Sequence, residues 1–211
     1  MSAPFTPKNL RAGLVIMDAD GTAIIRVITL QYNPDTLSRT LTPRGAVTDA
    51  GDRLEATRLK GPAAETIKFD AEIDAADQLE KPGNNPDTVS SGILPELAAL
   101  ETVISPTSSD MQIAEKLAAS GTIEILPLPS VLVLFVWGPK RVLPVRIQDF
   151  AVLEEAFDTN LNPIRAKVTM TLRVLSADDL APGSRGAGFA MAAMAAKEQI
   201  AKRQPAVLTA F

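Results

Sequence analysis

The sequence predicts a mainly β protein of the α+β class, an antiparallel β-barrel or sandwich of about six strands with one or two short helices and an Ala-rich C-terminal helix. Three observations predict it. Apolar and polar residues alternate with a period of two in several runs, most regularly in residues 165–175. Residues that favour turns stand between these runs. Helical spacing is confined to a few stretches outside them.

A β-hairpin is predicted near the N-terminus. Residues 14–17 and 24–30 are rich in β-branched side chains, and the turn-forming residues 18–21 separate them. An EF-hand calcium loop does not fit the same residues, because Ala23 and Thr29 stand where that loop needs Gly and Glu. After a turn at Asn33 and Pro34, the alternation of residues 37–41 predicts another short strand.

Residues 65–74 predict a strand with one buried face. Ile67, Phe69, Ala71 and Ile73 share that face, and the residues between them are polar or charged. Side chains on one face of a strand follow each other at about 7 Å, so the acidic residues of the wet face are not expected to form a catalytic pair. Polar loops are predicted on both sides of this strand, at residues 42–64 and 75–92.

Two helices are predicted between the two halves of the sheet. Residues 93–104 and 109–120 have amphipathic spacing. Pro95 suits the first turn of one helix, and Gly121 is a stop signal for the other.

The chain is predicted to end in an Ala-rich helix, residues 189–203. We interpret the Gly-rich residues 182–188 before it as a flexible hinge. The predicted organisation is therefore a β domain, residues 1–180, followed by a hinge, helix and tail at residues 181–211.

The longest sheet pattern lies in residues 131–175. Its first run, VLVLFVW, is apolar on both faces, which requires burial on both sides. The second cover is either a neighbouring subunit or a helix of the same chain. The next run reaches Phe157, and its alternation slips at residues 149–150, which predicts a β-bulge. After a turn at residues 158–163, the last run places one set of side chains on its apolar face: Ala166, Val168, Met170, Leu172 and Val174.

Composition excludes several kinds of chemistry. The 211 residues include no Cys and no His, which excludes disulfides, thiolate zinc sites, Cys nucleophiles and imidazole bases. A formal net charge of −4 at pH 7 disfavours binding to a nucleic-acid backbone. No secretory signal is visible, nor any apolar run of the about 20 residues that cross a bilayer. We therefore expect synthesis in the cytoplasm, with no catalytic residues, cofactor, metal site, nucleic-acid partner or membrane insertion.

Four segments together resemble a known family. They are FVWGPKRVLPVRIQDFAVLEEAFDTNLNPIRAKVTMTLRVL, LQYNPDTLSRTL, ETIKFDAEID and GILPELAALETVI. In this order they are similar to the tube-type proteins of extracellular contractile injection systems, the phage-tail-like particles of bacteria. The resemblance covers roughly residues 12–175.

The resemblance implies a tail-tube-like β-barrel that assembles into a hexameric ring at the baseplate end of the particle. In this family the ring joins the spike hub to the inner tube, so the implied partners are further copies of the chain, the hub, the tube or its initiator, and other baseplate components. Many members carry a peptidoglycan-binding LysM module after the tube domain, and no such module follows here. The expected product is a structural subunit incorporated into the particle.

Interface or structural roles are predicted for two groups of residues. The first belongs to the run that is apolar on both faces. The second consists of the turn after the N-terminal hairpin and the turn between the last two strands. The candidates are Val131, Val133, Phe135, Trp137, Tyr32, Asn33, Pro34, Phe157, Asn160, Asn162 and Pro163. The alternative hypothesis is a monomeric β-sandwich that binds carbohydrate or peptide, although one Trp and one Tyr supply few aromatic contacts for it. The C-terminal helix is expected to dock either on its own barrel or on a neighbour.

Overall fold

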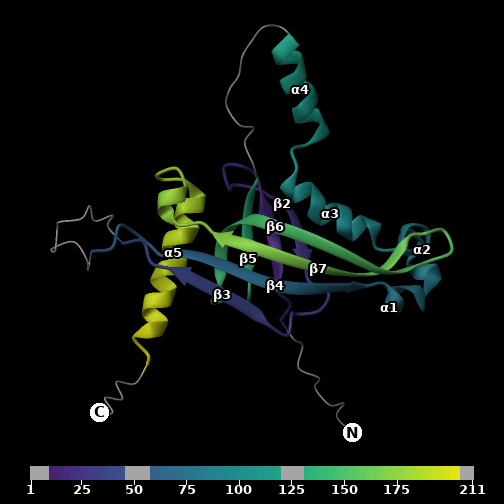
Figure 1. Ribbon diagram of the computed structural model, residues 1–211, viewed down its shortest axis with the longest axis horizontal. Helices are drawn as coiled ribbons and strands as arrows, with labels where there is room; N and C mark the ends of the chain where they lie inside the picture. Colours follow the sequence, from purple (N-terminus) through teal and green to yellow (C-terminus); the bar gives the residue numbers. More distant parts are fainter. Residues whose placement is uncertain (1–9, 46–57, 120–130, 205–211) are drawn as a thin grey trace.

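A computed structural model describes residues 10–45, 58–119 and 131–204. Its centre is one antiparallel sheet of seven strands in the order β2-β1-β5-β6-β7-β4-β3. The long strands β4, β6 and β7 run along the longest axis of the molecule, with α1 and α2 near one end and α5 across the other (Figure 1). The predicted fold class is confirmed, with one strand more than expected.

In the described part of the chain, all seven strands belong to this one sheet. The strands are β1 (Gly13–Met17), β2 (Ile24–Thr29), β3 (Leu37–Thr42), β4 (Ala64–Asp74), β5 (Leu132–Val136), β6 (Val142–Phe157) and β7 (Pro163–Val174). The helical elements are α1 (Ala76–Leu79), η1 (Pro82–Asn84), α2 (Pro86–Ser91), α3 (Leu94–Ile104), α4 (Ser108–Ala119), η2 (Ala177–Asp179) and α5 (Arg185–Ala201). The predicted N-terminal hairpin, the strands at β3 and β4, and the helices α3 and α4 are all confirmed.

The alternation of apolar residues predicts the buried face of the sheet correctly. Ala166, Val168, Met170 and Leu172 of β7 are completely buried, and Val174 packs against the same core from its margin. The sheet curls around this core, so that Phe69 of β4 stacks on the ring of a β5 residue, Phe135, with 5.4 Å between centroids. The barrel or sandwich of the prediction is thus a curled sheet. Within the described residues no ladder joins its edge strands β2 and β3.

The predicted irregularity in β6 is present. The register of β6 against β7 shifts between Ile147 and Asp149, one residue before the slip seen in the alternation. Two further shifts lie between Glu154 and Phe157. Such bulges bend a long strand and increase its twist, which fits the curl of this sheet.

The polar stretch 75–92 is not the loop that its composition suggests. It folds into α1, η1 and α2. Pro82 and Pro86 occupy first-turn positions of η1 and α2. Proline is tolerated there because a backbone N–H in the first turn has no hydrogen-bond partner within the helix. Each piece has six residues or fewer, so none shows a helical period. Tertiary contact stabilises the stretch: Ala75 is buried, and its N–H donates to the carbonyl oxygen of Ile164 at 2.9 Å.

Helix α5 begins earlier than the sequence suggests. Its N-cap is Ser184, whose hydroxyl accepts a hydrogen bond from the N–H of Ala187. Residues 185–188, predicted to belong to a hinge, are therefore the first turn of the helix. Gly186 is buried there, and a Cβ on it would lie 3.3–3.4 Å from side-chain atoms of Leu132 and Leu180. The division into two domains stays a prediction.

Some predictions lie outside the described residues. These are most of the loop at residues 42–64, the stop at Gly121 and the end of the last helix beyond residue 204. Among the helices that the structure describes, none is both long and apolar enough to cross a membrane.

Candidate assembly surfaces

Strand β5 is covered on both faces by its own chain. Val133 and Phe135 face the main core and are 5% and 0% exposed. Leu132 and Leu134 face the other way and are buried with Met17. Phe189 of α5 packs against this second cluster. The second face of VLVLFVW is thus covered by a helix of the same chain, one of the two possibilities that the sequence leaves open.

The interface candidates of this run consequently lie inside the subunit. Val131 and Trp137 flank β5, are partly buried and pack against the main core. The Trp137 ring lies 5.8 Å from that of Phe135, centroid to centroid. Val133 and Phe135 contribute nothing to the outer surface, so their role in this fold is structural.

The Tyr32–Pro34 turn ties the start of the chain to the sheet. The Asn33 side chain accepts from the N–H of Ala12 at 2.8 Å and donates to the carbonyl oxygen of Leu10 at 2.7 Å. Tyr32 is exposed and lines an open cavity of about 650 Å³. Pro34 lines the same cavity. An interface role of this turn stays a prediction.

The turn between β6 and β7 is organised by Asp158, which no pattern in the sequence distinguishes from its neighbours in the turn. Its carboxylate accepts from the backbone N–H groups of Asn160 and Asn162 at 2.7 and 2.8 Å. These hydrogen bonds, together with one from the Asn162 amide, lower the pKa of Asp158. Asn162 also donates to the carbonyl oxygen of Ser90 in α2, at 3.1 Å. The turn thereby holds the helical segment against the hairpin.

The remaining candidates of this turn divide between core and surface. Pro163 is buried, and its carbonyl oxygen accepts from the N–H of Ile93. Phe157 is 48% exposed, and its neighbour Leu161 is 80% exposed with a left-handed φ of 64°. The apolar surface of this turn is therefore available to a partner.

The outer strands of the sheet are β2 and β3, and beside β2 the Arg26 side chain donates to the carbonyl oxygen of Ala99 and to the hydroxyl of Thr102, both in α3. In the described part of the chain, β2 and β3 each pair with a strand on one side only. β2 exposes Ile24, Ile25 and Val27 by 57–62%. An edge strand with exposed β-branched residues is a template for a strand from another chain. The sequence predicts β2 as a strand but contains no signal that it lies at an edge.

Among the described residues, Glu65 is the charged residue that is buried. Its side chain is 4% exposed and lies at the end of the apolar face of β4. One carboxylate oxygen contacts Arg39 of β3 at 2.6 Å, and the other contacts Lys197 of α5 at 2.5 Å. Burial raises the pKa of Glu65, but the hydrogen bonds and charges of Lys197 and Arg39 outweigh it, so the pKa lies below its ordinary value. The alternation of β4 puts Glu65 in phase with Ile67 and Phe69, but a charged residue at the end of the pattern is no signal of burial.

We expect the Glu65 pairs to stabilise the fold above the pKa of an unfolded Glu, about 4.3. The folded pKa is lowered, so this stabilisation is present above about pH 4.3 and is lost as the pH falls through the folded pKa. Urea unfolding at several pH values checks it. Wild type is expected to exceed Glu65→Gln in free energy of unfolding at pH 7, and the difference is expected to shrink below pH 4.3. Glu101→Gln, at an exposed position of α3, is the control, and a difference independent of pH would contradict the role of Glu65.

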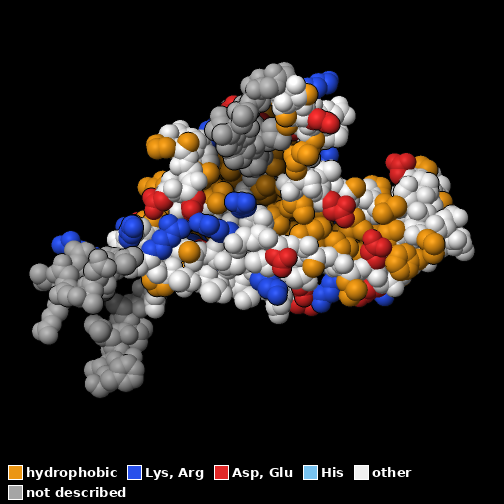
Figure 2. All heavy atoms as spheres, turned by 45° about the horizontal axis from the view of Figure 1, so that its top comes forward, with side chains coloured by type: hydrophobic (Ala, Val, Ile, Leu, Met, Phe, Trp, Pro, Cys, Tyr) orange, Lys and Arg blue, Asp and Glu red, His pale blue; other side chains and the backbone are white. Residues whose placement is uncertain are grey.

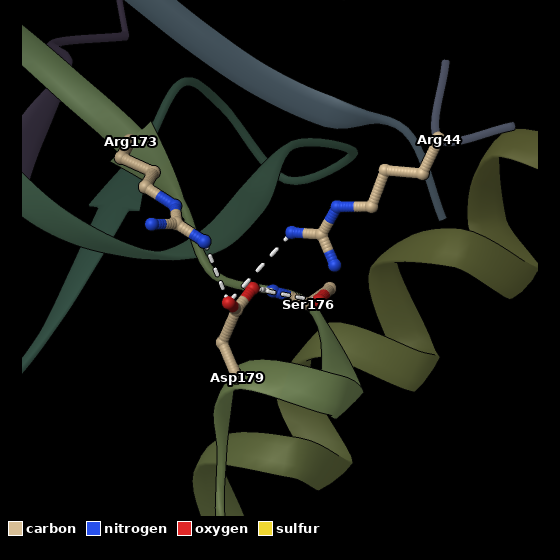
Figure 3. Close-up of polar contacts among 4 residues, drawn as sticks. All are labelled: Arg44, Arg173, Ser176 and Asp179. Carbon is tan, nitrogen blue, oxygen red and sulfur yellow. Dashed lines mark hydrogen bonds and ion pairs between the residues drawn. The ribbon is translucent and has the colours of Figure 1, made fainter. Parts of the chain in front are cut away.

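A second ionic cluster joins η2 to β7 (Figure 3). Asp179 contacts Arg173 at 2.6 Å and Arg44 at 3.8 Å, and it accepts hydrogen bonds from the hydroxyl and N–H of Ser176. Burial raises the pKa of Asp179, whereas the Ser176 bonds and the two guanidinium charges lower it further than burial raises it. This cluster fixes the exit from β7 toward α5.

The acidic face of β4 carries an ion pair to β7. Asp70 contacts Lys167 of β7 at 3.1 Å and accepts from the Thr169 hydroxyl at 2.7 Å. The Thr169 and Lys167 bonds lower the pKa of Asp70. Within residues 10–45, 58–119 and 131–204, no three acidic side chains gather as a metal site would require.

The chain was compared with protein-family models, curated proteins and solved structures. No protein-family model matches the chain, and no curated protein matches it. A solved structure that it is similar to is the tail of an empty GTA particle with C6 symmetry. The alignment covers 77% of this chain and 90% of that one, with 10% sequence identity and a TM-score of 0.27.

Proposed function

We propose that the chain is a structural ring subunit of a phage-tail-like contractile injection particle, joining the spike hub to the inner tube at the baseplate. Its partners are then further copies of itself, most simply six in a ring, together with the hub and the inner tube or its initiator. The protein would be made in the cytoplasm, would be incorporated into the particle and would catalyse no reaction.

The observation that carries the proposal is the pair of open edges on one curled sheet. A contact between two different patches of identical subunits is heterologous, and it closes into a ring when the rotation between copies allows. β2 and β3 are such patches, because they lie at opposite edges and each has six residues. All neighbouring strands of the seven-stranded sheet are antiparallel, so the two edge strands β2 and β3 point in the same direction. If β3 of one subunit pairs with β2 of the next, the two strands are therefore parallel.

The exposed apolar residues support the same function. Ile25 and Val27 of β2 and Leu41 of β3 are each at least half exposed, and such residues are buried when a strand adds to the sheet edge. The resemblance of four segments to tube-type proteins agrees with this use of the sheet.

The alternative, a monomeric module for carbohydrate or peptide, would need a concave site with aromatic side chains. Among the cavities of the described residues, the one beside Tyr32 contains that single aromatic residue. It is otherwise lined by polar, charged and small side chains. The observations therefore favour the ring.

Mass measurement of the purified chain across a range of concentrations tests the proposal. We expect a species of six times the chain mass, formed by the chain alone or after addition of the hub or tube protein that templates it. Negative-stain images of that species should show closed rings. A chain that stays monomeric with both partner layers present, and that binds a glycan or peptide instead, would disprove the proposed function.

A further inference from the structure

A cavity of about 440 Å³ lies between β2, the end of β4 and α3. This volume is within the range of about 300–1,000 Å³ that is usual for the binding sites of small ligands. Its apolar wall consists of residues that belong to the main core or pack against it: Ile28, Leu30, Ile73, Ile93 and Leu100. None of the described residues that line it is aromatic. The cavity therefore suits an aliphatic group and offers no ring on which a sugar or a base would stack.

Two sets of hydrogen bonds hold the walls of this cavity in place. The Gln31 side chain donates to the carbonyl oxygen of Asp74 at 2.6 Å and accepts from the N–H of Asp74 at 2.9 Å, which joins the segment after β2 to the end of β4. Arg26 of β2 donates to the carbonyl oxygen of Ala99 at 3.3 Å and to the hydroxyl of Thr102 at 3.2 Å, which joins β2 to α3. A site whose walls are fixed before binding loses little conformational entropy when a ligand enters.

Glu96 brings an unpaired carboxylate to the cavity. It lies in the first turn of α3 and lines the cavity. Its Oε2 atom is buried, and no donor of the described residues reaches that oxygen. A buried acceptor without a donor costs free energy, and native structures contain few such groups. Glu96 therefore lacks a hydrogen-bond donor, and the strong donors for a carboxylate are cations.

The charges around the cavity are balanced by one further cation. The described lining contains three carboxylates and two guanidinium groups, those of Glu72, Asp74, Glu96, Arg11 and Arg26. The Arg26 guanidinium is engaged with α3, and Arg11 is exposed. Residues 1–9, which precede Arg11 in the sequence, contain one charged residue, Lys8. The lining thus has one negative charge in excess, and Arg11 and Lys8 are the internal cations with which a ligand would compete.

Figure 2 shows the same combination of side chains on the side of the molecule where α3 lies. Hydrophobic side chains gather there between α4 and the end with α1 and α2, and separate Asp and Glu side chains stand among them. Lys and Arg gather mainly nearer to α5. A ligand with an aliphatic body and one positive charge matches these surroundings.

We propose that this cavity binds a small aliphatic primary amine. The ammonium group lies against the Glu96 carboxylate, and the carbon chain lies along Ile28, Ile93 and Leu100. An anionic ligand is disfavoured because carboxylates outnumber guanidinium groups in the described lining. The inference goes beyond the proposed function and does not depend on it, because a single subunit contains the whole site.

Isothermal titration calorimetry of the full chain with n-hexylamine tests the site. We expect n-hexylamine to bind at least tenfold more tightly than n-hexanol, which has the same carbon chain without the charge. Glu96→Gln keeps the size of the side chain and removes its charge, so it is expected to weaken n-hexylamine binding at least tenfold. Glu101→Gln is the matched control, because Glu101 is exposed on the same helix and does not line the cavity. Absence of n-hexylamine binding, or an equal loss in both variants, would overturn the proposal.

Glu96→Gln has a second expected effect, in the absence of amine. Removal of an unpaired buried charge should leave the chain at least as stable as wild type in a urea titration, so weaker binding would not result from unfolding. Addition of n-hexylamine should raise the urea midpoint of wild type and not that of Glu96→Gln, because a ligand stabilises the state that binds it. A clear loss of stability in Glu96→Gln would show that Glu96 has a structural partner and would refute the site.

Two further variants test the position of the amine. Ala99→Leu fills the cavity from α3 with Glu96 unchanged, and it is expected to abolish n-hexylamine binding. Arg11→Gln with Lys8→Gln removes the competing cations and is expected to bind n-hexylamine at least as tightly as wild type. Thermal melts control for folding. Binding that persists in Ale99→Leu, or that weakens in the double variant, would place the amine elsewhere and contradict the proposal.

Discussion

Replacement of Phe135 by Asp is expected to leave the chain unfolded at 25 °C. The ring is completely buried and stacks on Phe69 and beside Trp137. Loss of a buried Phe side chain costs about 3–5 kcal/mol, and an unpaired carboxylate in its place adds several more. Together these losses approach or exceed the free energy of unfolding of a typical domain, about 5–15 kcal/mol. Far-ultraviolet circular dichroism and a urea titration would measure it.

The same experiment distinguishes a core role of β5 from an interface role. Phe135→Leu keeps an apolar side chain and is expected to fold, with a loss of about 1.5 kcal/mol. Leu161→Asp places the same acid at a position that is 80% exposed and should change stability by no more than about 0.5 kcal/mol. If Phe135→Asp folded normally and lost only its assembly, the burial of β5 within the subunit would be contradicted.

Ring formation is expected to disappear when Ile25 and Val27 are both replaced by Asp. Both side chains are exposed on the edge strand β2, by 59% and 57%, and Ile25 lies at the β-bulge where the register of β1 against β2 shifts. At each contact between subunits, burial of two carboxylates would cost more free energy than the pairing of the two strands contributes. The monomer should remain folded, because both positions are more than half exposed and strand propensity changes by about 1 kcal/mol at most. Mass measurement checks the ring, and a thermal melt checks the fold.

Leu153→Asp is the matched control for this edge. Leu153 is 60% exposed, close to Ile25 and Val27, but it lies on β6 inside the sheet. The control should therefore keep the ring if the edges form the joint. Rings that survive the double replacement in β2, or that are lost equally in Leu153→Asp, would place the subunit contact elsewhere on the molecule.

Local patterns predicted most of the elements because the face of a strand depends on sequence spacing alone. Ala166, Val168, Met170 and Leu172 are two residues apart and all point to the core. The pattern fails where elements are short. α1 and α2 have too few residues for a helical period, and the buried Ala75 and the bond from Asn162 to Ser90 hold them in place.

The assembly surfaces depend on contacts far apart in the chain. VLVLFVW requires two buried faces, and that requirement is visible in the sequence. Only the tertiary structure decides that Phe189, more than 50 residues away, covers the second face. Val133 and Phe135 thereby become core residues, whereas Ile25 and Val27, equally apolar, are left on an open edge.

The amino-acid sequence therefore determines the α+β class, the core face of each long strand and the absence of thiol and imidazole chemistry, because composition and spacing are properties of neighbouring residues. The tertiary structure alone decides which strands are edges, which helix closes the core and which charges meet. Glu65 shows the reason: its alternation puts it on the buried face, and its partners Arg39 and Lys197 lie 26 and 132 residues away. A buried carboxylate is tolerated when its countercharges are brought to it, and only the folded chain brings them.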